Sequence, residues 1–158
     1  MTTKTSYSGL QIALHWAIAL LIGANYLISE GMGRFLDKHL EGEAVSGLTP
    51  NFHVYAGVAV MVLALVRLVV RATSGAPEAA SEGSWMDLGA VWAHRALYLL
   101  MILVPALGAG AWYLGIEDLG DVHVLAMNAM MIIAGLHALA ALFHQFVLKD
   151  GLLKRMTP

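Results

Sequence analysis

The sequence lacks cysteine altogether and has few charged residues for its length. Of its 158 residues, 13% are Asp, Glu, Lys or Arg, against about 25% in an ordinary soluble domain. Without thiols the chain can form no disulfide, thiolate metal site, iron–sulfur cluster, covalently attached c-type haem or cysteine nucleophile. So few charges cannot cover a water-facing surface. The net charge of −2 offers no basic surface for nucleic acid, which we exclude as a partner.

What the chain has instead is long apolar stretches, with 59% hydrophobic residues and a mean hydropathy of +0.71. Four stretches are long enough to cross a lipid hydrocarbon core of about 30 Å, which takes about 20 helical residues. They cover residues 10–29, 52–71, 88–114 and 122–147. No alternation of period two indicates a barrel. We therefore expect an all-α membrane protein, a single four-transmembrane-helix bundle over residues 1–158. The first stretch is too long for a signal-peptide core and lacks an Ala-x-Ala-like exit, so it is expected to stay as a helix.

Basic residues favour one side of this bundle. With four spans, both termini and the middle connection share a side, which holds seven of the nine Lys and Arg residues. Because Lys and Arg favour the cytoplasmic side, both termini are expected in the cytoplasm. The opposite side holds Arg34 and Lys38 beside seven acidic residues. There, residues 34–40 are predicted to form a short interfacial helix, with His39 in solvent.

Six of the seven histidines lie in or at the ends of the apolar stretches, where ionisable side chains are costly. They are His15, His53, His94, His123, His137 and His144. Any one of them is most simply a hydrogen-bonding contact between helices. Spacing changes that balance, because His123 and His137 are 14 residues apart and so share a helix face about 21 Å apart along the axis. The alternating direction of the spans places His53 at the depth of His123, and His15 at the depth of His137.

Two imidazole pairs in a dry bundle predict two haem groups. Zinc would need four ligands, and no Cys, Asp or Glu cluster accompanies these histidines, whereas haem iron needs only two axial ligands. The expected pairs are His53 with His123 and His15 with His137. Two alternatives stay open: His144 lies close to the helix face of His137, and Met127, one turn after His123, would give a His/Met pair.

Four further residues are candidates for the surroundings of these groups. Arg67 and Arg71 could pair with haem propionates, although basic residues at a cytoplasmic helix end are expected for topology alone. His94 and Tyr98, one turn apart, could hydrogen-bond a quinone or a propionate, or His94 could anchor the helix at the interface.

Four features carry a resemblance to a known family. They are Tyr7-Ser8-x-Leu10-Gln11-Ile12-x-x-His15-Trp16, His53 with Arg67 and Arg71 closing the second span, His94-x-x-x-Tyr98, and a tail from Gly135-Leu136-His137-Ala138 through His144 to Lys149-Asp150-x-Leu152-Leu153-x-Arg155-Met156. Through them nearly the whole chain resembles the bacterial cytochrome b561 family of dihaem membrane cytochromes. Related subunits of hydrogenases and formate dehydrogenases place their haem ligands on the first, second and fourth spans.

The resemblance implies two haem b groups in the bacterial inner membrane. It also implies electron transfer between ubiquinone and a donor at the periplasmic face, and some members of the family oxidise superoxide there. A second reading is a membrane-anchor subunit that relays electrons for a larger dehydrogenase or hydrogenase. A third is a haem-free bundle whose histidines only join helices, which the absence of colour in the purified protein would reveal.

The charge asymmetry makes the orientation testable. A reporter enzyme that works only in the periplasm, fused after Pro158, should stay silent because the basic side is retained in the cytoplasm. The same reporter inserted between Glu41 and Glu43 serves as the control and should be active. Activity of the fusion after Pro158 would reverse the assignment of the two sides.

Overall fold

The computed structural model describes residues 6–75, 77 and 85–157. Its helices are α1 (Gly9–Ile28), α2 (Met32–Leu40), α3 (Leu48–Ser74), α4 (Trp85–Leu114), α5 (Asp118–Phe143), a π-helical turn η1 (His144–Leu148) and a 3₁₀ turn η2 (Leu152–Met156). Four helical stretches are long and apolar enough to span a membrane, namely Gly9–Ile28, Leu48–Ser74, Met86–Leu114 and Asp118–Leu148. The predicted all-α, four-span bundle is therefore confirmed. α1 matches the predicted first span to within one residue at each end, and α3, α4 and α5 begin three or four residues before the predicted spans.

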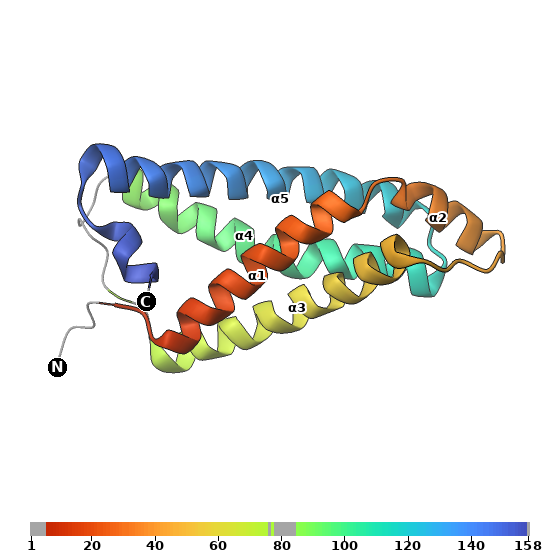
Figure 1. Cartoon of the computed structure of the whole chain (residues 1–158), viewed down its shortest axis with the longest axis horizontal. Coiled ribbons are helices and arrows are strands. Elements are labelled where there is room, and N and C mark those ends of the chain that lie inside the picture. Colours follow the sequence, from red (N-terminus) through yellow and green to blue (C-terminus); the bar gives the residue numbers. More distant parts are fainter. Residues whose placement is uncertain (1–5, 76, 78–84, 158) are drawn as a thin grey trace.

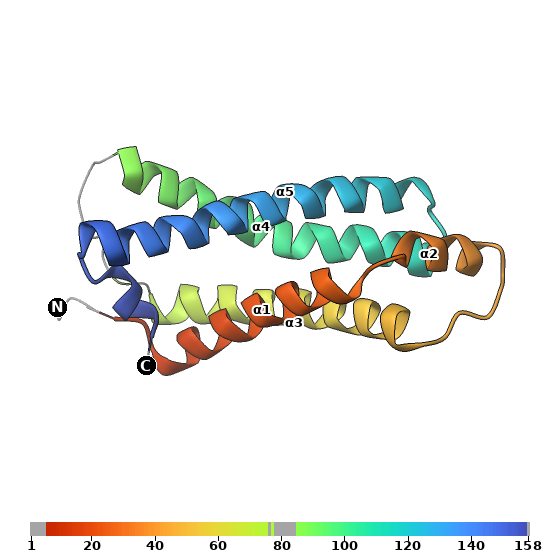
Figure 2. The ribbon, with the colours of Figure 1, turned by 45° about the horizontal axis from the view of Figure 1, so that its top comes forward.

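The four long helices run lengthwise beside one another (Figure 1, Figure 2). In chain order each packs on the next, α1 on α3, α3 on α4 and α4 on α5. The start of α1 and the turn η2 lie at one end, which we call the terminal end, and α2 lies at the other, the α2 end (Figure 1). Lys4 and most of the middle connection, residues 76 and 78–84, lie outside the described residues.

The start of α1 explains part of the first sequence motif. Ser8 caps the helix: its hydroxyl accepts from the Gln11 amide, while the Gln11 side chain accepts from the Ser8 amide. This reciprocal capping box satisfies two helix-end donors. Gln11 is buried and its Nε2 also donates to the carbonyl of Gly75, the cap residue that ends α3, at 2.9 Å. The motif thus fastens the first helix to the end of its neighbour.

The short helix α2 confirms that the residues predicted as a helix, 34–40, are helical, but His39 is not free in solvent. Its ring stacks on Trp112 with centroids 4.2 Å apart and planes at 3°, and its Nε2 donates to the Trp112 carbonyl at 3.0 Å. Leu36, on the same helix, packs closely on Gly120. A Cβ built on Gly120 would lie 2.9 Å from Leu36 Cδ2. The sequence did not indicate this contact, because the partner Trp112 lies 73 positions away along the chain. These contacts hold α2 across the end of the bundle.

Few side chains are buried, and many large apolar ones are exposed along the long helices. A water-soluble bundle would bury such a stripe, whereas in lipid the outer surface is itself apolar. The small buried set includes Leu14, Ile18, Val60 and Ala64 on α1 and α3. The exposed apolar surface therefore fits a bundle that faces lipid.

Candidate functional site

A cavity of about 800 Å³ opens at the α2 end of the bundle. Its walls come from all five α-helices and include His53 on α3 and His123 on α5. Gly57, Gly108 and Met127 also line it. This volume is within the range of cavities that take cofactor-sized ligands, about 300–1,000 Å³. The predicted pair of histidines is thus brought into one enclosed space.

The rings of His53 and His123 have centroids 5.8 Å apart and planes at 73°. Both rings are held by hydrogen bonds at Nδ1. His123 Nδ1 lies 2.8 Å from the Val104 carbonyl, and His53 Nδ1 lies 2.6 Å from Ser29 Oγ. A carbonyl oxygen can only accept, so His123 donates through Nδ1–H and keeps its lone pair on Nε2.

Glycine at position 108 permits the close approach of the His123 ring. A Cβ built on Gly108 would lie 3.0 Å from His123 Nδ1 and 3.1 Å from its Cε1. Val104 lies one turn before Gly108 on α4, and its carbonyl accepts from the His123 ring of α5. The sequence Val104–Gly108 therefore forms a seat for the imidazole of α5.

At the terminal end, three imidazoles from three helices lie together. His15 on α1 and His137 on α5 have ring centroids 6.4 Å apart with planes at 81°. His94 on α4 is closer to His137, at 5.0 Å, and its Nδ1–H donates to the Ala90 carbonyl at 2.7 Å. The sequence had paired His15 with His137 by depth, and the structure adds His94 as a third ring.

These distances test whether haem fits. With metal–nitrogen bonds of about 2 Å and ring nitrogens about 1.1 Å from the ring centre, two imidazoles on opposite faces of one iron have centres about 6 Å apart. The 5.8 Å and 6.4 Å separations match this value. The 5.0 Å between His94 and His137 is too short for an iron between them. The donor set fits two bis-histidine haem sites, and within the described residues no group of three or more His, Asp or Glu is placed to hold a metal.

Arg67 is the charged residue at the centre of the terminal-end cluster. Its Nε donates to the Tyr98 hydroxyl at 2.9 Å and its guanidinium also donates to the Gln11 carbonyl at 3.3 Å. It lies within electrostatic range of His15, His94 and His137, and Arg71 within range of His94. Arg67 thus connects three helices beside the histidines, and the propionate and quinone roles predicted for this group stay predictions.

His144, the alternative ligand, is occupied elsewhere. Its Nδ1 lies 2.5 Å from Asp150 Oδ2, which also ties the turn η1 to the C-terminal segment. That hydrogen bond, with a second from the Leu152 amide, holds the pKa of the Asp150 carboxyl below its ordinary value. The carboxylate therefore stays charged at neutral pH, and its stabilising effect is lost only as the pH falls through the lowered pKa. Trp16 Nε1 fastens the same segment by donating to the Met156 carbonyl.

Sequence reasoning missed the partners of the ligand candidates, namely Ser29, Asn25, Val104 and Gly108. Asn25 offered a signal, because it is a polar side chain inside an apolar span, where polar groups need a partner. The role of Val104 had none, since it acts through a backbone carbonyl. Gly108 was one of several helix glycines, which are common in membrane helices for packing alone.

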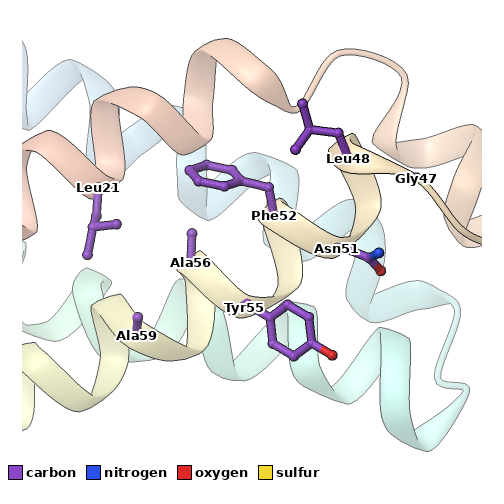
Figure 3. A pocket seen from close by; sticks show the side chains of 8 residues that line it. All are labelled: Leu21, Gly47, Leu48, Asn51, Phe52, Tyr55, Ala56 and Ala59. Atoms are coloured by element: carbon purple, nitrogen blue, oxygen red, sulfur yellow. The ribbon is translucent and has the colours of Figure 1, made fainter.

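A second, shallow depression lies between α1 and α3 near the α2 end (Figure 3). Its lining includes Leu21, Leu48, Phe52 and Tyr55, and Phe52 points toward α1 (Figure 3). It lacks histidines and charged groups in its lining. We assign it no chemistry.

A four-span bundle with two facing imidazole pairs defines a membrane cytochrome. Comparison with known proteins gives the family: residues 6–158 match the family described as prokaryotic cytochrome b561, and the chain belongs to it. It is 46% identical to cytochrome b562 of Cereibacter sphaeroides over 99% of this chain and 98% of that protein. It is 32% identical to the probable superoxide oxidase CybB of Yersinia pestis, over 96% of each chain. No solved structure matches. The chain is thus a multi-pass membrane cytochrome that carries haem b and transfers electrons.

The seat at Gly108 gives a testable consequence. In Gly108→Ala the new methyl group must displace the His123 ring from the Val104 carbonyl, and loss of such an orienting contact typically weakens metal binding about 10–100-fold. We expect the purified protein to retain less haem b per chain, although alanine favours a helix over glycine by about 0.5–1 kcal/mol.

Gly89→Ala is the matched control on the same helix, because a Cβ there meets nothing within 4 Å. Pyridine haemochrome measurement of haem per protein decides the outcome. Equal haem retention in the two variants would contradict the seat.

Proposed function

We propose that this protein is an inner-membrane dihaem cytochrome b that moves single electrons between ubiquinone and a donor at the periplasmic face. The observation that carries the proposal is the spacing of the two imidazole pairs, 5.8 Å and 6.4 Å between ring centroids. Haem b bound at each pair supplies a one-electron carrier. The positive-inside rule supports placing the α2 end at the periplasm and the terminal end at the cytoplasm.

The chain's own residues divide the work between the two ends. His53 with His123, and His15 with His137, are assigned as axial ligands. His123 and His137 are 14 residues apart on one helix, so the two pairs lie about 21 Å apart along the axis, one in each leaflet.

The terminal-end cluster is our candidate quinone site. His94 donates its Nδ1–H to the Ala90 carbonyl, so its Nε2 has a lone pair that can accept a hydrogen bond from a quinol hydroxyl. The Tyr98 hydroxyl accepts from Arg67 and so has its own proton to donate to a quinone carbonyl. Arg67 and Arg71 can hold a propionate or an anionic reduced quinone.

Superoxide is a second candidate substrate, because the chain is 32% identical to a probable superoxide oxidase. The charge at the α2 end argues against an anion. Five carboxylates line the cavity there, and Arg34 and Lys38 do not. Lys38 instead pairs with Glu43 at 3.8 Å. The five are Glu30, Asp37, Glu117, Asp118 and Asp121. Their field favours a neutral or cationic donor and slows the approach of an anion.

The ligand assignment is tested by removing one imidazole at a time. His123→Ala and His137→Ala should each lose one of two haems, because each leaves one iron without an axial ligand. His144→Ala is the control and should retain both, since His144 contacts Asp150 instead. The measurements are haem per chain and the reduced-minus-oxidised spectrum. Full dihaem content in His137→Ala, or a colourless native protein, would overturn the proposal.

The acidic cavity mouth is tested with soluble one-electron donors of opposite charge. A cationic donor should reduce the haems faster than superoxide or another anionic donor, and added salt should narrow the difference because it screens the field.

The variant Glu117→Gln/Asp118→Asn neutralises two carboxylates of the cavity lining and should also narrow the difference in rate between cationic and anionic donors. The control Glu41→Gln/Glu43→Gln lies outside the cavity lining and should change this difference less. Stopped-flow absorbance of the haems measures each rate. Fast reduction by superoxide that is insensitive to salt and to both variants would contradict the electrostatic argument.

A further inference from the structure

His53 is held by a short chain of groups from the end of α1. The Ser29 hydroxyl lies 2.6 Å from His53 Nδ1. The same hydroxyl donates to the Asn25 carbonyl one turn earlier, and the Asn25 side chain donates to the His53 backbone carbonyl at 3.4 Å. Asn25 of α1 and Ser29, the residue that caps the end of this helix, thus contact the backbone and the ring of one residue of α3.

The protons of this chain can be assigned by counting donors. A serine hydroxyl has one proton, and a carbonyl oxygen can only accept. Because the Ser29 proton goes to the Asn25 carbonyl, Ser29 Oγ is left as an acceptor toward the ring. His53 must therefore donate from Nδ1, and its lone pair is on Nε2.

The two imidazole pairs differ in this respect. At the α2 end both rings have a fixed Nδ1 partner, the Ser29 hydroxyl for His53 and the Val104 carbonyl for His123. At the terminal end, the part of the chain that the structure describes provides no hydrogen bond to the ring nitrogens of His15 or His137. Of the two partners at the α2 end, Ser29 contributes a side chain, which mutation can remove, and Val104 contributes a backbone carbonyl, which mutation leaves in place.

We propose that Ser29, fixed by Asn25, is a positioning residue for His53: it sets the tautomer that leaves Nε2 for iron and lowers the reduction potential of the α2-end haem. An acceptor at Nδ1–H makes the imidazole a stronger donor through its other nitrogen, which favours the oxidised metal. This inference rests on the proposed ligand role of His53. It goes further by naming the group that tunes one haem and not the other.

The experiment uses the purified full-length protein with its haems. In Ser29→Ala we expect the reduction potential of one haem to rise while the other is unchanged, and one haem to transfer to an added haem-acceptor protein about 10–100-fold faster. The electron paramagnetic resonance signal of the same haem should change, because the imidazole is free to rotate. Ser29→Thr keeps the hydroxyl and should restore all three readouts.

Ser46→Ala is the matched control, since it removes an exposed serine hydroxyl outside the cavity lining. The unaffected haem reports that Ser29→Ala is folded. If both haems keep native potentials and release rates in Ser29→Ala, Ser29 does not position His53, although the dihaem proposal stands. If both haems change equally, the effect is structural and the inference is overturned. A native protein without two haems would instead refute the proposed function.

Discussion

A neutral imidazole has one N–H donor and one lone pair, and inside a membrane neither can be satisfied by water. Each buried histidine therefore needs two partners supplied by the bundle or by something the bundle holds. The N–H groups of His53, His123 and His94 have partners in the chain, and among residues 6–75, 77 and 85–157 the structure gives their lone pairs no hydrogen bond. At the α2 end, the two histidines with such unused lone pairs, His53 and His123, line the cavity of about 800 Å³.

The helix packing follows from the same constraint. α1, α3, α4 and α5 pack on one another in sequence, yet few residues are buried along them. Small residues allow the closest approaches where an imidazole or a leucine must fit, as at Gly108 against His123 and at Gly120 against Leu36. Charged and capping groups fasten the ends instead, with Gln11 and Arg67 joining three helices at the terminal end. The polar contacts therefore join the helices near the terminal end, while the cavity lies at the α2 end.

Much of the fold could be predicted from the sequence, because a membrane leaves few choices for an apolar stretch of about 20 residues. The pairing of His53 with His123 and of His15 with His137 followed from depth alone, since helix rise converts residue number into distance. Depth does not give the rotation of one helix against another. For that reason the sequence left the role of His94 open between a quinone, a propionate and the membrane interface, and did not predict that its ring lies against His137.

What could not be predicted are contacts made by backbone or by residues with many common roles. The stacking of His39 on Trp112 and the seat formed by the Val104 carbonyl depend on the relative translation of two helices, which no local pattern encodes. Charged residues differ from these contacts, because the sequence gives the sign of each charge and leaves only its position in the structure unknown. The acidic residues at the α2 end were evident from composition, and the structure adds that five of them line the cavity while Lys38 is paired with Glu43. Because these five carboxylates line the opening, their field acts on any donor that approaches it and favours a neutral or cationic donor over an anion.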